Sequence, residues 1–123
     1  MYLCIDSQER NNHHLILFEK GKKKEVYGNH PFLLVSIENF LQSEGVPKKD
    51  IQGIAVVIGK GTFSSVRMAV TLANAWHYSL HIPIISISPQ ELSELDGCVD
   101  QLQAQKESGY ILPHYSGPPN IGK

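Results

Sequence analysis

The hydrophobic pattern is most informative between Gly53 and Ser88, where it predicts a strand, a helix and a second strand. Ile54–Ile58 is a run of five apolar residues without polar alternation, which is typical of a strand buried on both faces of a sheet. A glycine-containing turn separates it from a helix predicted over Ser64–Leu80, and Ile84–Ser88 is the next strand. Such a strand–helix–strand crossover builds parallel sheets.

The helix predicted over Ser64–Leu80 is unusually apolar. Arg67 is its one formally charged residue, and apolar side chains cover well over half of its circumference. A helix that lies on one face of a sheet needs an apolar stripe only a little wider than about 100°. Either other helices of the chain or another protein should therefore cover the remaining apolar surface.

Three further strands are predicted ahead of this segment. Tyr2–Asp6 and Leu15–Phe18 are short apolar runs, and the polar residues Ser7–Asn12 between them indicate a turn. The third strand, Lys24–Tyr27, is weaker and more polar, which suits the edge of a sheet.

One helix is predicted between these strands and the crossover, over Pro31–Glu44. Asn29 or His30 can cap it, and Gly45 ends it. Phe32 and Val35 fall outside its expected core face, which is formed by Leu33, Leu34, Ile37, Phe40 and Leu41. This helix therefore also has apolar surface beyond what a sheet covers.

A third helix is predicted to start at the capping box formed by Ser88 and Glu91. Its apolar side consists of Leu92, Leu95, Val99 and Leu102. After Glu107 the chain becomes rich in proline and glycine. We therefore divide it into a domain at residues 1–107 and an extended tail at residues 108–123.

The predicted order of elements is β-β-β-α-β-α-β-α. It indicates an α/β fold with a five-stranded mixed sheet, a central first strand and helices on the faces of the sheet. This is the ribonuclease H-like fold, which also forms one lobe of the actin-like kinases. The fold alone does not assign chemistry.

Composition narrows the class of protein. A chain of 123 residues with 41% hydrophobic and 19% charged residues is expected to form one soluble domain. Its net charge of −1 argues against a basic nucleic-acid-binding domain. We expect no membrane span and no signal peptide. Cys4 and Cys98 are predicted to be reduced core thiols, as in a cytoplasmic protein.

Asp6 ends the first strand, where nucleases of this fold keep a metal-binding carboxylate. Two-metal hydrolysis of a phosphodiester needs several acids around the ions. The strand Ile54–Ile58 ends without an acid, and Glu38 on the first helix is the only other candidate. A ribonuclease H-like nuclease or a small nucleotide hydrolase is therefore the alternative function rather than the favoured one.

The turn Gly59–Thr62 has the form of an anion site because a glycine turn enters a helix there. The spacing of the P-loop is missing, so we favour a turn that lets helix and strand pack closely.

Histidines and lysines offer two weaker candidate sites. His77 and His81 are spaced like a metal-binding pair on a helix, but no acid accompanies them and His13–His14 lacks ligand spacing, so a solvated or capping role is favoured. The lysines of a predicted hairpin favour a solvated sheet edge, with RNA contact as the alternative. They are Lys20, Lys22, Lys23 and Lys24.

Three short motifs allow comparison with a known family. Ile5-Asp6-Ser7 ends the first strand, His30 precedes the first helix, and a phrase of glycine and hydroxyl residues runs from Gly59 to Arg67. In these motifs the chain resembles the TsaB (YeaZ) family, whose phrase is Gly-Pro-Gly-Ser-Phe-Thr-Gly-x-Arg. The positions that match it or exchange one hydroxyl residue for another are Gly59, Gly61, Thr62, Phe63, Ser64 and Arg67, whereas Lys60 and Ser65 depart from it.

The resemblance covers about residues 2–92 and a tail segment at Leu112–Pro119. It implies a shortened form with only the N-terminal actin-like lobe. It also implies a non-catalytic protein that binds TsaD, the enzyme that transfers a threonylcarbamoyl group to adenosine 37 of tRNA, through its first two helices. TsaE joins that complex, and contact with tRNA is only indirect. The resemblance implies no metal and no cofactor, except a nucleotide at the interface with TsaD.

The favoured function is therefore a cytoplasmic, non-enzymatic partner of TsaD. We expect its binding surface on the two helices with spare apolar surface, and a homodimer through the same surface in isolation. Alanines four apart are expected to let a partner helix approach closely. The predicted exposed patch comprises Phe32 and Val35 on the first helix with some of Val66, Ala69, Val70, Ala73 and Trp76 on the second.

Overall fold

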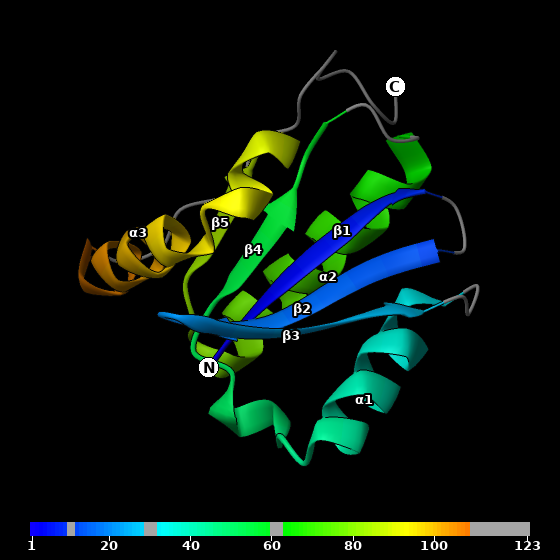
Figure 1. The fold of residues 1–123 in the computed structure, drawn as a ribbon, viewed down its shortest axis with the longest axis horizontal. Coiled ribbons are helices and arrows are strands. Elements are labelled where there is room, and N and C mark those ends of the chain that lie inside the picture. Colours follow the sequence, from blue (N-terminus) through cyan, green and yellow to red (C-terminus); the bar gives the residue numbers. More distant parts are fainter. Residues whose placement is uncertain (10–11, 29–31, 60–62, 109–123) are drawn as a thin grey trace.

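The computed structural model describes residues 1–9, 12–28, 32–59 and 63–108, which form one mixed sheet flanked by helices (Figure 1). The predicted order of strands and helices is confirmed. The strands are β1 (Tyr2–Glu9), β2 (Asn12–Glu19), β3 (Lys22–Gly28), β4 (Ile54–Val57) and β5 (Ile84–Ile87). The α-helices are α1 (Leu33–Glu44), α2 (Phe63–Leu80) and α3 (Leu95–Ser108), and the short 3-10 helices are η1 (Lys48–Asp50) and η2 (Pro89–Ser93).

β1 is the central strand, as predicted, in a sheet whose order is β3-β2-β1-β4-β5. It pairs antiparallel with β2 and parallel with β4, so that Cys4 stands opposite Ile16 on one side and Ala55 on the other. β2 and β3 are antiparallel, and β4 and β5 are parallel. β3 lies at an edge of the sheet, which confirms the prediction from its polar sequence.

Two hydrophobic cores lie on opposite faces of the sheet, because successive side chains of a strand point to opposite sides. α1 and α2 pack over Leu3 and Ile5 of β1 on one face. α3 packs over Tyr2 and Cys4 on the other (Figure 1). β4 contributes side chains to both cores, which confirms that its uninterrupted apolar run is a strand covered on both sides.

The first hairpin extends further than its apolar pattern predicts. β1 continues to Glu9, β2 begins at Asn12, and these two residues pair with each other. The turn predicted over Ser7–Asn12 is therefore wrong at both ends. Polar residues complete the ladder because its hydrogen bonds are made by the backbone.

α1 begins at Leu33, later than the predicted start at Pro31. Its N-cap is Phe32, whose side chain cannot cap, and no side-chain capping bond is made. The predicted caps Asn29 and His30 lie outside the described residues. Gly45 ends the helix with a φ of 67°, as predicted, because glycine adopts this left-handed conformation without a Cβ clash.

The capping box of Ser88 and Glu91 is present, but it starts η2 rather than α3. The backbone N–H of Ser88 donates to Glu91 Oε1 at 2.8 Å. The backbone leaves helical geometry at Glu94, and α3 begins at Leu95. A local capping signal therefore marks a helical turn without fixing how far the helix continues.

α3 has the apolar side that the sequence predicts, with Leu95, Val99 and Leu102 buried and Leu92 of η2 packed beside them. It runs through Ser108, so the predicted boundary at 107/108 falls inside this helix. Residues 109–123, the rest of the predicted tail, lie outside the described part of the chain. None of the helices within the described ranges is long and apolar enough to cross a membrane.

Candidate partner-binding surface

The apolar residues of α2 that were predicted to be exposed instead face the sheet. Val66, Ala69, Val70, Ala73 and Trp76 are between 0% and 6% exposed, so the predicted patch is wrong for this helix. These positions recur every three or four residues and form a single stripe. The small side chains of Ala69 and Ala73 let α2 approach the sheet closely. They do not serve the predicted approach of a partner helix.

A different apolar surface lies on the outer side of α1 and α2. Phe32 is 64% exposed, as predicted, and Leu34 and Met68 are each 42% exposed, whereas Val35 is half-buried. A groove of about 590 Å³ runs along this side of α2 next to α1. We call it the α1/α2 groove; it is lined by Leu34, Arg67, Met68, Thr71, Leu72, Ala75 and Trp76.

Leu34 was predicted in the core face of α1, and this is wrong. Ser36 is buried in the core instead, where the helix passes close to β3. A Cβ placed on Gly28 of β3 would lie 2.9 Å from the Cβ of Ser36, so this close approach needs glycine on the strand and a small residue on the helix. Packing Ser36 against β3 turns Leu34 toward the groove.

The sequence contains a signal for the groove in apolar residues of α2 that the predicted patch does not include. Met68, Leu72 and Ala75 are apolar residues of α2 that lie outside the stripe of fully buried positions, although Leu72 also packs against the edge of the core. They lie on its outward side, and helical spacing places them next to one another. The surplus apolar surface predicted for α2 is therefore real, but, apart from Trp76, different residues form it.

The family-motif residues are only partly described. Asp6 is half-buried, and Ser7 is buried with its Oγ 3.2 Å from His13 Nδ1. Gly59 is half-buried, and Arg67 is exposed and lines the groove. His30, Gly61 and Thr62 lie outside the described residues, as do the side chains of Phe63 and Ser64 in the first turn of α2.

The described side chains do not assemble the acids that the nuclease alternative needs. Among them, no group of three or more His, Cys, Asp or Glu residues is placed to hold a metal ion. Glu38 is exposed on α1, whereas Asp6 is half-buried on β1. The alternative of a two-metal nuclease therefore gains no support from this part of the chain.

His77 and His81 close the C-terminal end of α2. His77 is buried, and its Nδ1–H donates to the carbonyl oxygen of Ile82 at 2.5 Å. His81 is exposed with a φ of 56°, and its N–H donates to the carbonyl of His77. These contacts agree with the favoured capping role.

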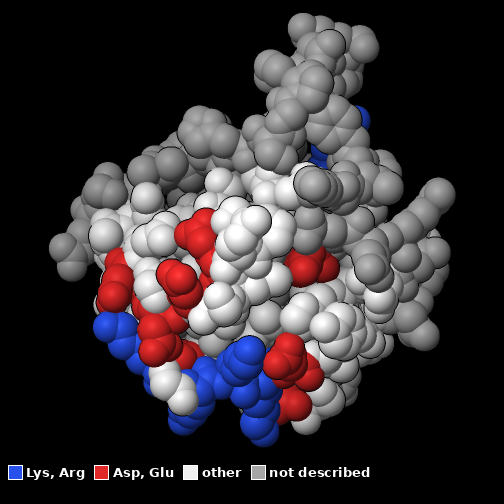
Figure 2. Space-filling model, turned by 45° about the horizontal axis from the view of Figure 1, so that its top comes forward, with Lys and Arg blue, Asp and Glu red and all other residues white. Residues whose placement is uncertain are grey.

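The hairpin lysines lie beside acidic side chains. Lys20 is 2.8 Å from Asp100, Lys24 is 3.1 Å from Glu44, and weaker pairs join Lys23 to Glu25 and Lys22 to Glu19. Figure 2 shows positive and negative side chains interspersed on this rim of the molecule. A neutralised rim offers little attraction for RNA phosphates, so the solvated-edge interpretation is the better supported.

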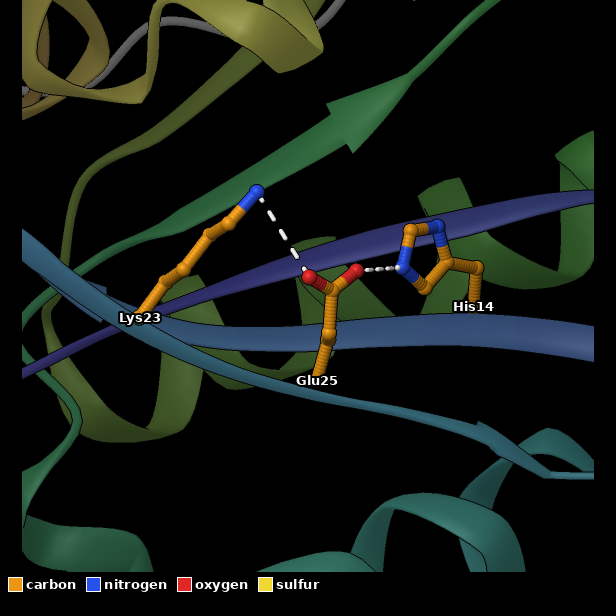
Figure 3. Close-up of polar contacts among 3 residues, drawn as sticks. All are labelled: His14, Lys23 and Glu25. Carbon is orange, nitrogen blue, oxygen red and sulfur yellow. Dashed lines mark hydrogen bonds and ion pairs between the residues drawn. The ribbon is translucent and has the colours of Figure 1, made fainter.

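A polar cluster on β2 and β3 surrounds Glu25 (Figure 3). His14 Nε2–H donates to Glu25 Oε1 at 2.6 Å, and the His14 ring stacks on Tyr27 with centroids 4.3 Å apart. The hydrogen bond from His14 lowers the pKa of Glu25, Lys23 adds to the effect, and partial desolvation opposes it.

This lowered pKa predicts a small dependence of stability on pH. Because the folded-state pKa of Glu25 lies below its ordinary value of 4.5, its contribution is complete above that pH and is lost as the pH falls through the folded-state value. Glu25→Gln should therefore flatten the stability curve below pH 4.5, by no more than about 0.5 kcal/mol because the side chain is 40% exposed. Urea unfolding at a series of pH values measures this, with Glu38→Gln as the exposed control; equal curves for both variants would contradict it.

The two cysteines are free, buried thiols, as predicted. Burial raises the pKa of Cys4 far above its ordinary value, and it raises the pKa of Cys98 to about 11. The protonated thiol is a poor nucleophile, so both residues act as small core side chains.

Comparison with known proteins places this geometry in context. The family model described as TsaD, tRNA N6-adenosine threonylcarbamoyltransferase, matches residues 31–109. The tRNA threonylcarbamoyladenosine biosynthesis protein TsaB of Buchnera aphidicola (subsp. Acyrthosiphon pisum, strain APS) is 33% identical over 85 residues, which are 69% of this chain and 37% of that protein.

Solved structures share the fold. YeaZ from Pseudomonas aeruginosa superposes with a TM-score of 0.61 at 24% identity, over 71% of this chain and 44% of that one. A second structure, described as an uncharacterized protein with similarity to peptidase YEAZ from Pseudomonas aeruginosa, gives 0.61 and 24% over 72% and 44% of the two chains. At this identity the likeness concerns the fold alone.

The mixed five-stranded sheet with α1 and α2 on one face and α3 on the other is an actin-like α/β lobe, which confirms the predicted fold class. The TsaD family model spans more than half of the chain and fits this fold, and the sequence relative and the structural neighbours are TsaB and YeaZ proteins. The chain belongs to the TsaB (YeaZ) family. It spans less than half of the length of the relatives that it matches.

Proposed function

We propose that this chain is a non-catalytic partner subunit that binds and stabilises TsaD through the α1/α2 groove. Its role would be in the transfer of the threonylcarbamoyl group to adenosine 37 of tRNA. Membership of the TsaB (YeaZ) family supports the pathway, since the Buchnera relative is named for threonylcarbamoyladenosine biosynthesis. The apolar groove on the outside of α1 and α2 carries the proposal of a binding role.

A binding role accounts for apolar side chains that are exposed to water and that add no stability to the monomer. Leu34 and Met68 line the groove, and Phe32 lies one residue ahead of α1, so partly exposed apolar groups gather on one side of the molecule. Contiguous exposed apolar patches on soluble proteins commonly mark interaction sites. Covering this patch with a partner removes it from water and adds favourable free energy of association.

The same surface would be free to pair with a second copy when TsaD is absent, so we also propose a homodimer in isolation. Contact with tRNA would run through TsaD. The contacts with TsaE and with an interfacial nucleotide remain predictions from the family resemblance. The two buried, free thiols suit the reducing cytoplasm, where we place this role.

Co-expression with the TsaD homologue of the same organism, followed by size-exclusion chromatography, tests the proposal. Ala75→Glu places a carboxylate in the groove and should weaken the complex about 100-fold or more, because an unpaired buried charge costs several kcal/mol. Ala104→Glu is the matched control, since Ala104 is exposed on α3 across the sheet. Circular dichroism should show both variants folded.

Binding of TsaD by wild type and Ala104→Glu, with loss in Ala75→Glu, would support the proposal. Unchanged binding by the folded Ala75→Glu variant would place the interface elsewhere. Absence of any complex with the wild-type chain would refute the partner role itself.

A further inference from the structure

The α1/α2 groove is apolar along its length but has a positive charge at each end. Arg67 lines the groove near the start of α2. At the other end the Lys48 ammonium lies 5.1 Å from the ring centroid of Trp76, which also lines the groove. Arg67 and Trp76 are nine positions apart on α2, which is about 13.5 Å along the helix axis.

These two cations are not neutralised by the described part of this chain. No acidic side chain is among the described residues that line the groove. Within the described residues neither Arg67 nor Lys48 has a carboxylate within ion-pair distance, whereas all four hairpin lysines do. Glu38 is exposed on α1 outside the groove lining.

We infer that the groove takes an amphipathic helix whose apolar ridge carries an acidic residue near each end. The apolar floor matches the ridge, and the two cations fix the position of the helix along the groove through complementary charges. The inference rests on the proposed function, which names the protein that supplies the helix. It adds which side chains of that helix the groove recognises.

A second copy of this chain matches the groove less well than such a helix. In an antiparallel, two-fold arrangement the α2 helix of the second copy would bring its own Arg67 toward Lys48, and like charges would meet at both ends. Glu38 on α1 and Asp50 on η1 are exposed acidic residues by which a second copy could reach these cations. The self-paired state is therefore expected to be weaker than the pair with an acidic partner.

Three helical peptides of one design test this chemistry without the partner protein. All share a leucine and alanine ridge, and they carry glutamate, glutamine or lysine at its two end positions. Fluorescence anisotropy with the full chain should rank their affinities glutamate, glutamine, lysine, with about three- to tenfold between successive peptides and a smaller spread at high salt. Non-specific attraction to a chain of net charge −1 would favour the lysine peptide instead.

Variants of the chain assign the preference to the two cations. The double variant Lys48→Gln, Arg67→Gln should bind the three peptides equally, and the matched control Lys20→Gln, Lys22→Gln should keep the wild-type ranking. Three results would each overturn the inference. They are equal binding of the three peptides to wild type, the reverse ranking, and no detectable binding of any peptide at a concentration of about 1 mM. Sedimentation of the chain alone tests the other occupant: tight self-association that Glu38→Gln abolishes and the glutamate peptide cannot displace would also overturn it.

The outcome for TsaD separates this inference from the proposed function. If Ala75→Glu loses TsaD binding while Lys48→Gln, Arg67→Gln binds TsaD with unchanged affinity and salt dependence, the function stands and the inference fails. If the peptides rank as expected but wild type forms no complex with TsaD, the inference stands and the function fails.

Discussion

Ala73→Glu is expected to unfold the protein or to lower its free energy of unfolding by several kcal/mol. Ala73 is 0% exposed in the core between α2 and the sheet, and the core around it is built from aliphatic and aromatic side chains. A glutamate there needs volume that the close contact of helix and sheet does not provide. Its carboxylate would also lose its hydration without gaining a partner.

Ala75→Glu is the matched control, because it makes the same substitution two residues further along α2 on the exposed side. Thermal and urea unfolding followed by circular dichroism compare the two variants with wild type. The midpoint for Ala75→Glu should stay near that of wild type, whereas Ala73→Glu should show little or no cooperative transition. Equal midpoints for the two variants would contradict the placement of α2 on the sheet.

Trp76→Ala is expected to lower the free energy of unfolding by about 3–5 kcal/mol. Trp76 is 6% exposed, belongs to the core on the α1/α2 side of the sheet, and supports Lys48 through a cation–π contact. Removing the indole leaves a cavity that the neighbouring helices and strands cannot fully close. It also removes one end of the groove, so peptide or partner binding should weaken together with stability.

Urea unfolding should be followed by circular dichroism, because Trp76 is the one tryptophan of the chain and its fluorescence disappears with it. Trp76→Phe keeps an aromatic ring and should recover most of the lost stability. Lys48→Gln removes only the cation, with an expected loss of about 0.5–1 kcal/mol. A loss no greater for Trp76→Ala than for Lys48→Gln would show that the indole does not contribute to the core.

The fold was predictable because each strand and helix has a hydrophobic pattern matching its position in the layers. β4 is apolar at every position because helices cover both faces of its sheet, and β3 is polar because it lies at an edge. The ends of elements were less predictable. The polar ends of β1 and β2 pair through their backbones, to which side-chain periodicity is insensitive.

The binding surface was only partly predictable, because hydrophobicity does not say which side of an all-round apolar helix faces the sheet. Ala73 and Ala75 have the same side chain, yet Ala73 is fully buried and Ala75 lines the groove. The orientation of α1 likewise depends on the fit between Gly28 and Ser36, which lie on different elements, at the end of β3 and in the first turn of α1. Such fits between elements set the rotation of each helix, and they become visible only in three dimensions.

The central position of β1 has a consequence for how the chain is assembled. Its antiparallel partner, β2, follows within one hairpin, but its parallel partner, β4, lies about fifty residues later, with Leu3 opposite Ile54. While the chain grows on the ribosome, β1 therefore stays an open strand edge until α1 and β4 have been synthesised. Open apolar edges invite pairing with other chains. The time between the synthesis of β1 and that of β4 is therefore when this protein is most exposed to misassembly. Shortening that time is a direct way to improve the folding yield.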